Sequence, residues 1–219
     1  MAHEVTAFIP FRKGSAGVVD KNIRQLCGRP LWWHTMNAAL TGGVDRVILA
    51  TDYDGAILGE LPEGVDVWSR QGMHNTDSKA STDMVVRDWL EAMPEVTGTV
   101  ILLQVTNQFT TSSDVQRAVA EYNREPLGVL ISAVKCEHII WRRGTAGMWE
   151  CTPIVRRQAM PEQWIENGAF HVFTADYFRR YGTRYAGKVR FCPMCPESIH
   201  DIDTEEDWQL VRELVEGQL

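Results

Sequence analysis

The chain has no excess of positive charge. Among its 219 residues, 22 lysines and arginines stand against 29 aspartates and glutamates, which gives a formal net charge of −7. A protein that binds duplex nucleic acid through a broad basic surface is therefore not expected. An anionic ligand would have to be bound by a local cationic pocket instead.

Long apolar runs and export signals are also missing. No stretch of about 18 apolar residues occurs, so no membrane-spanning helix is predicted. The opening MAHEVTAFIPF has no basic segment and too short an apolar run, so no signal peptide is predicted. The five cysteines are scattered and odd in number, and we therefore expect free thiols and a cytoplasmic protein.

Short apolar runs alternate with amphipathic stretches along the chain. Strands are predicted at residues 5–11, 46–51, 65–68, 99–104, 128–134 and 189–194. Helices are predicted at residues 31–40, at 77–93, from 112 or 113 onward, and after 204. This alternation is typical of a Rossmann-like α/β fold, a mostly parallel sheet with helices on both faces. The length suits a single domain over residues 1–219.

Residues 136–170 interrupt the alternation. They contain short aromatic-rich runs (HIIWRR, MWECTPIV and AFHVF) that have no clear helical period. We interpret this segment as a small antiparallel arm, an insertion of the kind that often forms a dimer surface. A homodimer is therefore expected.

Segment 12–22, directly after the first predicted strand, carries the strongest single indication of function. Gly14 and Gly17 allow the backbone to approach a ligand closely, and successive amide groups there can form an anion nest. Arg12 and Lys21 flank the glycines with positive charge. The segment is neither a Walker A loop nor a dinucleotide fingerprint. It predicts a polyphosphate-binding loop, with a solvated glycine turn as the alternative.

Asp201 and Asp203 are the second candidate group. They stand two residues apart on a predicted extended segment, so both carboxylates point the same way. Two hard oxygen ligands, supplemented by phosphate oxygens and water, suit Mg²⁺. The pair predicts a magnesium site, and the alternative is a polar strand end before a helix that Thr204 caps.

Several short motifs occur in order along nearly the whole chain. They are Phe11-Arg12, Ser15-Ala16-Gly17, Lys21-Asn22, Gly28-Arg29-Pro30-Leu31, Thr51-Asp52, Leu102-Leu103-Gln104, Arg157-Gln158, Asn167-Gly168-Ala169 and Asp201-Ile202-Asp203-Thr204. Together they resemble the cytidylyltransferases that activate sialic acids and related 2-keto-3-deoxy sugar acids, including 3-deoxy-manno-octulosonate. Each motif is weak alone, but their order and spacing are specific.

The resemblance implies an enzyme that transfers CMP from CTP to an acidic sugar, with Mg²⁺ as cofactor and release of pyrophosphate. It implies nucleotide contacts at Arg12, Ser15, Gly17, Lys21, Asn22 and Ser81. It implies acceptor contacts at Gln104, Arg157, Asn167 and Gly168, and metal ligands at Asp201 and Asp203. Arg12, Lys21 and Asp203 are the expected catalytic residues. Either Asp203 or a hydroxide held by the metal would take the proton of the attacking hydroxyl.

Three departures from the family pattern fall near the expected phosphate and acceptor sites. Ala16 replaces a lysine, residues 105–110 read Val-Thr-Asn-Gln-Phe-Thr in place of Pro-Thr-Ser-Pro-Leu-Arg, and Ile165 stands where a cation is common. We therefore expect an unusual acceptor, such as a different nonulosonic acid or a phosphonate. The alternatives are a nucleotidyltransferase for another base or a sugar phosphate, and a catalytically silent nucleotide-binding homologue.

Overall fold

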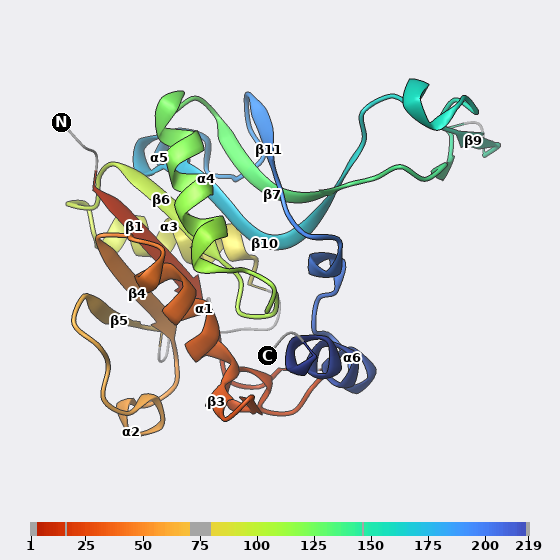
Figure 1. Cartoon of the computed structure of the whole chain (residues 1–219). Coiled ribbons are helices and arrows are strands. Elements are labelled where there is room, and N and C mark those ends of the chain that lie inside the picture. The colour runs from red at the N-terminus through yellow and green to blue at the C-terminus, as the bar shows by residue number, and fades with distance from the viewer. Residues whose placement is uncertain (1–3, 16, 71–79, 146, 218–219) are drawn as a thin grey trace.

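The computed structural model describes residues 4–15, 17–70, 80–145 and 147–217, except for the side chain of Arg157. Its centre is a seven-stranded sheet in the order β11-β7-β10-β6-β1-β4-β5 (Figure 1). The strands are β1 (Val5–Pro10), β4 (Arg46–Thr51), β5 (Val65–Ser69), β6 (Thr99–Leu103), β7 (Val129–Lys135), β10 (Trp164–Thr174) and β11 (Val189–Pro193). Only β10 runs antiparallel to its neighbours in this sheet. The predicted α/β fold is confirmed.

Helices cover both faces of the sheet, because successive strand residues point to opposite sides. Ala7 and Ile9 of β1 share one apolar cluster with side chains of α1 (Leu31–Thr41), α4 (Ser112–Arg124) and α6 (Glu205–Glu216). Phe8 belongs to the opposite cluster, with α3 (Thr82–Ala92) and α5 (Ala175–Tyr181). The shorter elements are η1 (Lys21–Ile23), β2 (Gln25–Leu26), β3 (Arg29–Pro30), α2 (Gly55–Leu58), η3 (Arg157–Ala159) and η4 (Pro196–Ile199).

Local capping sets most helix boundaries. α1 begins after Pro30 and ends at Thr41, directly before Gly42 and Gly43, as its sequence predicts. α4 begins at Ser112, as predicted, and Thr111 and Asp114 form a capping box at its start. Thr204 caps α6 through a second capping box with Asp207, as predicted. No helix in the described ranges is both long and apolar enough to cross a membrane.

Three elements differ from the sequence expectation. Residues 164–170, which the sequence assigned to the arm, begin β10 and lie inside the sheet. Their alternation is broken by a bulge between Glu166 and His171 that contains Gly168 at a φ of +69°. α5 has only seven residues and was not predicted. α3 begins at Thr82 rather than at Asp77, and residues 71–79 lie outside the described structure.

The remaining arm is an antiparallel pair, β8 (Trp141–Arg143) with β9 (Trp149–Cys151). Figure 1 shows that it extends away from the sheet beyond the ends of β7 and β10. The arm exposes large apolar side chains, with relative exposures of 58% for Trp141 and 65% for Trp149.

Candidate active site

The loop after β1 folds over the carboxyl end of the sheet, where ligands bind in open α/β folds. The Phe11 amide donates to the Ala50 carbonyl at 3.0 Å, and the Lys13 amide donates to Asp52 Oδ1 at 2.7 Å. Asn22 Nδ2 donates to the Arg12 carbonyl at 2.9 Å and closes the loop from its far end. The loop is therefore held by side chains of its own segment and of the segment after β4.

A cavity of about 210 Å³ opens beside this loop. Five residues with predicted roles line it: Arg12, Ser15, Lys21, Asn22 and Gln104. The rest of its lining is Pro10, Phe11, Arg70, Ala80, Thr82, Val85, Val105 and Thr106. Residues from the ends of β1, β5 and β6 and from the start of α3 thus meet around one space.

Lys21 joins the loop to the carboxylate segment. Its side chain is only 9% exposed, and Nζ donates to the Ile202 carbonyl and lies 3.4 Å from Asp203 Oδ1. Because a buried ammonium group is unstable without partners, these contacts fix the position of the segment. They bring together residues that are 182 positions apart in the chain.

Gly17 lies against the backbone of the same segment. A Cβ atom at this position would stand 1.8 Å from the Asp203 carbonyl oxygen and 3.0 Å from its carbonyl carbon. Only glycine permits this approach of the two main chains. Gly17 therefore allows the loop to lie directly against the backbone of Asp203.

The Gly17→Ala variant is expected to push the loop and the carboxylate segment apart. Such overpacking costs about 1–3 kcal/mol of unfolding free energy, and a displacement near 1 Å reduces a catalytic rate by about tenfold to 100-fold. Gly55→Ala is the control, since nothing lies within 4 Å of its added Cβ. Urea unfolding and turnover measured on both variants test this, and equal behaviour of the two would contradict it.

Asp201 is half-buried, whereas the Asp203 side chain is 77% exposed. Burial, and also the charge of Asp203, raises the pKa of the Asp201 carboxyl, while a hydrogen bond with Thr106 opposes the shift. The described residues contain no group of three or more His, Cys, Asp and Glu side chains able to hold a metal ion. A cation between these two carboxylates would need further ligands from a substrate or water.

Arg70 and Thr106 line the cavity but were not predicted from the sequence. Arg70 is 3% exposed; burial lowers its guanidinium pKa, Asp52 raises it, and Arg12 lowers it. It is the first residue after β5, so the rule that ligands meet the carboxyl ends of parallel strands would have found it.

Two other predicted residues, Ser81 and Gly168, do not line the cavity. Ser81 is the N-cap of α3, between Ala80 and Thr82, and its hydroxyl accepts the Met84 amide at 3.2 Å. Gly168 lies in the β10 bulge. The side chain of Arg157, at the start of η3, lies outside the described structure.

Asn167 is nearly inaccessible, at 4% exposure. Its Nδ2 donates to Ser198 Oγ at 2.8 Å and to Met194 Sδ at 3.4 Å. The amide that the family resemblance assigned to acceptor binding thus has its partners inside the protein.

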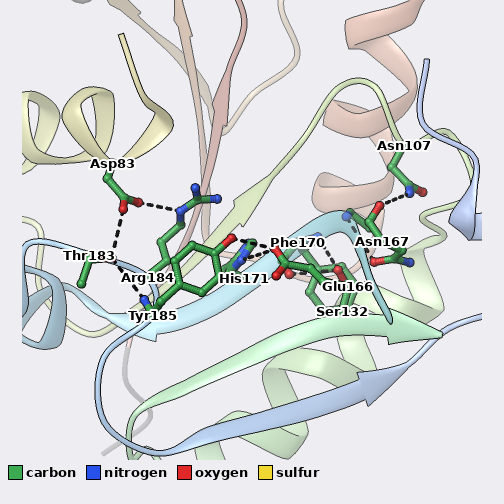
Figure 2. A network of polar contacts seen from close by, with 11 residues as sticks. Asp83, Asn107, Ser132, Glu166, Asn167, Phe170, His171, Thr183, Arg184 and Tyr185 are labelled. Carbon is green, nitrogen blue, oxygen red and sulfur yellow. Dashed lines mark hydrogen bonds and ion pairs between the residues drawn. The ribbon is translucent and has the colours of Figure 1, made fainter. Parts of the chain in front are cut away.

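A second polar network crosses from β10 to α3 (Figure 2). His171, at 1% exposure, places Nε2 3.0 Å from Glu166 Oε1, and the Tyr185 hydroxyl donates to the same oxygen at 2.9 Å. Arg184 Nε donates to Asp83 Oδ1 at 2.6 Å in the first turn of α3. The network therefore links the bulge of β10 to the helix whose start borders the cavity.

This network predicts a loss of stability in mild acid. Burial lowers the pKa of His171, with Arg184 acting in the same direction and Glu166 and Asp83 opposing. Neutral His171 therefore stabilises the folded state at pH values above about 6.5, the pKa of histidine in the unfolded chain. As the pH falls below that value, the free energy of unfolding decreases by up to about 1.4 kcal/mol per pH unit. The pKa of Glu166 is also lowered, chiefly by its hydrogen bond with His171, so a further loss follows below about pH 4.5.

Chemical unfolding between pH 7.5 and 5 tests the assignment to His171. The His171→Gln variant should show a shallower fall in unfolding free energy with decreasing pH than the unsubstituted protein. His138→Gln is the matched control, because His138 is exposed, and it should keep the original dependence. An unchanged slope in His171→Gln would show that other groups titrate.

Comparison with known proteins places the sequence among cytidylyltransferases. A model of the Cytidylyltransferase family matches residues 6–139. N-acylneuraminate cytidylyltransferase B of Danio rerio is 27% identical over 217 residues, 95% of this chain and 51% of the relative. The N-acylneuraminate cytidylyltransferase of Streptococcus agalactiae serotype III is 28% identical over 210 residues, 91% of this chain and 50% of the relative. The chain thus spans about half the length of these curated relatives.

Solved structures share the whole fold. A CMP:2-keto-3-deoxy-manno-octonic acid synthetase complexed with CTP aligns with a TM-score of 0.67 at 17% identity, over 99% of this chain and 100% of that one. A 4-diphosphocytidyl-2C-methyl-D-erythritol synthase from Anaerococcus prevotii gives 0.69 at 14% identity, over 98% and 99%. At such identities the likeness shows the fold alone. Since the family match covers more than half of the sequence, this chain belongs to the cytidylyltransferase family.

Proposed function

We propose that the chain transfers CMP from CTP to an acidic sugar, releases pyrophosphate and uses Mg²⁺. The observation that carries this proposal is the Lys21 bridge: Lys21 lines the cavity beside the loop after β1, and its Nζ contacts the Asp201–Asp203 segment. A cationic loop and a carboxylate pair are the two parts that nucleotidyl transfer requires. The names of the similar relatives support cytidine as the base and a sialic acid as the acceptor class.

The residues of the loop would bind the triphosphate. Arg12 and Lys21 supply fixed positive charge beside the cavity, and Arg70 adds a third cation from the end of β5. Such groups stabilise charge that develops on the phosphates as the bond to pyrophosphate breaks. In this proposal Ser15 and Gly17 bring loop amides to the phosphates, and Asn22 and Ser81 contribute to selection of the base.

Asp201 and Asp203 fit Mg²⁺ because both donors are oxygen atoms and because a cation would relieve the repulsion between two neighbouring carboxylates. When bound, Mg²⁺ would neutralise phosphate charge. Lys21 already balances Asp203 from one side, at 3.4 Å. Positioning of the two reactants by these residues would supply most of the catalysis.

The acceptor would lie near Gln104, which follows β6 and lines the cavity. Position 110, an arginine in the family pattern, is a threonine with 8% exposure. The change removes a cation from the loop beside the acceptor, which supports an acid that is bound differently from the usual sialic acid. A phosphonate or another nonulosonic acid fits this change.

The arm would join two copies of the chain. Met148 and Ile154 are 71% and 73% exposed, and Trp149, next to Met148 in the sequence, is also exposed. Contiguous apolar groups of this kind mark protein contact surfaces. We expect sedimentation at the mass of a homodimer, and sedimentation at the mass of one chain would contradict this part of the proposal.

A pyrophosphate-release assay tests the function. The purified chain is given each of the four nucleoside triphosphates with Mg²⁺ and a panel of sialic, legionaminic, pseudaminic, octulosonic and phosphonic acids. Release with CTP and one class of acid is the expected result. Preference for UTP or GTP would indicate a different nucleotidyltransferase. No release across the panel, with no rise in melting temperature on adding CTP, would indicate a catalytically silent homologue.

A further inference from the structure

η4 ends at Ile199, two residues before Asp201, and is held by the loop after β6 and by the bulge of β10. Asn107, in the loop after β6, donates from Nδ2 to the Ser198 carbonyl at 2.7 Å and to the Asn167 carbonyl at 2.9 Å. Asn167, in the bulge of β10, donates from Nδ2 to Ser198 Oγ at 2.8 Å. Ser198 Oγ in turn donates to the Cys195 carbonyl at 2.6 Å.

The side chains of Asn107, Asn167 and Ser198 form a buried group. Asn107 is 1% exposed, Asn167 is 4% exposed and Ser198 is fully buried. A buried polar contact is costly to break, because the group that loses its partner has no water to replace it. The contacts therefore hold η4 at one position relative to the β6 loop and the β10 bulge.

The position of η4 sets that of the carboxylates. Asp201 follows Ser198 by three residues, and the same β6 loop reaches Asp201 through a hydrogen bond with Thr106. Gln104 begins this loop, and its main-chain amide donates to the Ala169 carbonyl at 2.9 Å. The carboxylate segment and the expected acceptor residue thus share one rigid support.

We propose that Asn107, Asn167 and Ser198 are positioning residues that hold the Asp201–Asp203 segment in place to bind the metal, and that they do not bind the acceptor. This inference rests on the proposed magnesium-dependent function. Removing a residue that hydrogen-bonds and orients the metal ligands typically weakens metal binding by about 10- to 100-fold. Figure 2 shows the side-chain amide of Asn107 directed at the backbone of Asn167.

Asn107 also gives a reason for one departure from the family pattern. The pattern has serine at this position, and a serine hydroxyl has one proton to donate, whereas the asparagine amide has two. The amide here donates to two carbonyls on different segments. Asn107→Ser should therefore retain part of the support and Asn107→Ala none.

Binding of Mn²⁺, a spectroscopic probe for the magnesium site, tests the proposal without turnover. Free Mn²⁺ is followed by electron paramagnetic resonance while protein is titrated in the presence of CTP and without an acceptor. Asn107→Ala is expected to raise the Kd for Mn²⁺ by about tenfold or more, and Asn107→Ser by less. Ser198→Ala should also raise the Kd for Mn²⁺. Because this variant removes only one hydroxyl group, it keeps the test possible if Asn107→Ala does not fold.

Ser132→Ala is the matched control for Ser198→Ala. Ser132 is equally buried and exchanges hydrogen bonds of 3.0 and 2.8 Å with Phe170, within the sheet. Both variants should lose similar stability, but only Ser198→Ala should bind Mn²⁺ more weakly. A merely structural role of Ser198 would leave the two Kd values equal.

Two outcomes would overturn the inference alone. One is an unchanged Kd for Mn²⁺ in Asn107→Ala and Ser198→Ala while the unsubstituted protein binds the ion. The other is a higher KM for the acceptor, with unchanged Mn²⁺ binding, which would make Asn107 an acceptor ligand. If the unsubstituted protein binds no Mn²⁺ with CTP, the proposed metal site itself fails, and the inference fails with it.

Discussion

Replacing Lys21 with methionine is expected to lower kcat/KM for CTP by about 100- to 1,000-fold, the usual effect of removing one preorganised charged donor. Lys21 lines the cavity and also bonds the Ile202 carbonyl and Asp203. The variant would lose a phosphate contact and the link between the loop and the carboxylates. Steady-state release of pyrophosphate measures the loss.

Lys188→Met is the control for the lost charge. Lys188 pairs with Glu125 at 2.6 Å on the surface, with 52% of its side chain exposed. Surface pairs contribute about 0–1 kcal/mol, so this variant should keep normal kinetics. A Lys21→Met protein with normal kcat/KM would refute the role of the bridge in catalysis.

Replacing Asp201 with asparagine should separate activity from stability. We expect kcat to fall by about 1,000-fold, which corresponds to roughly 4 kcal/mol of lost transition-state stabilisation. Burial and the neighbouring charge of Asp203 disfavour the charged form of Asp201 in the absence of a cation. The melting temperature without metal should therefore stay the same or rise.

Asp176→Asn is the matched control, since the Asp176 side chain is 87% exposed and its Oδ1 lies 3.5 Å from Nη1 of Arg179 at the surface. It should leave both quantities unchanged. Equal rates for Asp201→Asn and the unsubstituted chain would remove Asp201 from the metal site. A large fall in the melting temperature of Asp201→Asn would show that its carboxylate is structural.

Strands and helices could be predicted from the sequence where their hydrophobic pattern or their flanking residues were distinctive. Arg46–Thr51 and Leu31–Thr41 have a buried run or clear punctuation, and their boundaries were predicted within one residue. β10 was assigned to the arm because Gly168 and the bulge interrupt its alternation, and because only its tertiary neighbours show that it is central. Local pattern carries no information on such long-range pairing.

Some residues of the candidate site could likewise be predicted from the sequence, and others could not. Charged residues near glycines or at a spacing of two, such as Lys21 and Asp203, are visible in the sequence, and the fold places them in contact. Arg70 has no local pattern and is found only when the ends of the strands are brought together. Resemblance alone does not distinguish a residue that touches a ligand from a positioning residue, the role that we propose for Asn167 because its amide donates to Ser198.

The identity of the product tests the central claim most directly. The chain would be incubated with CTP, Mg²⁺ and the acid that supports release of pyrophosphate, and the mixture analysed by mass spectrometry. We predict one new species with the combined mass of CMP and the acid less water, formed in equal amount to pyrophosphate. Pyrophosphate accompanied only by free CMP, or no reaction with any acid, would contradict the account.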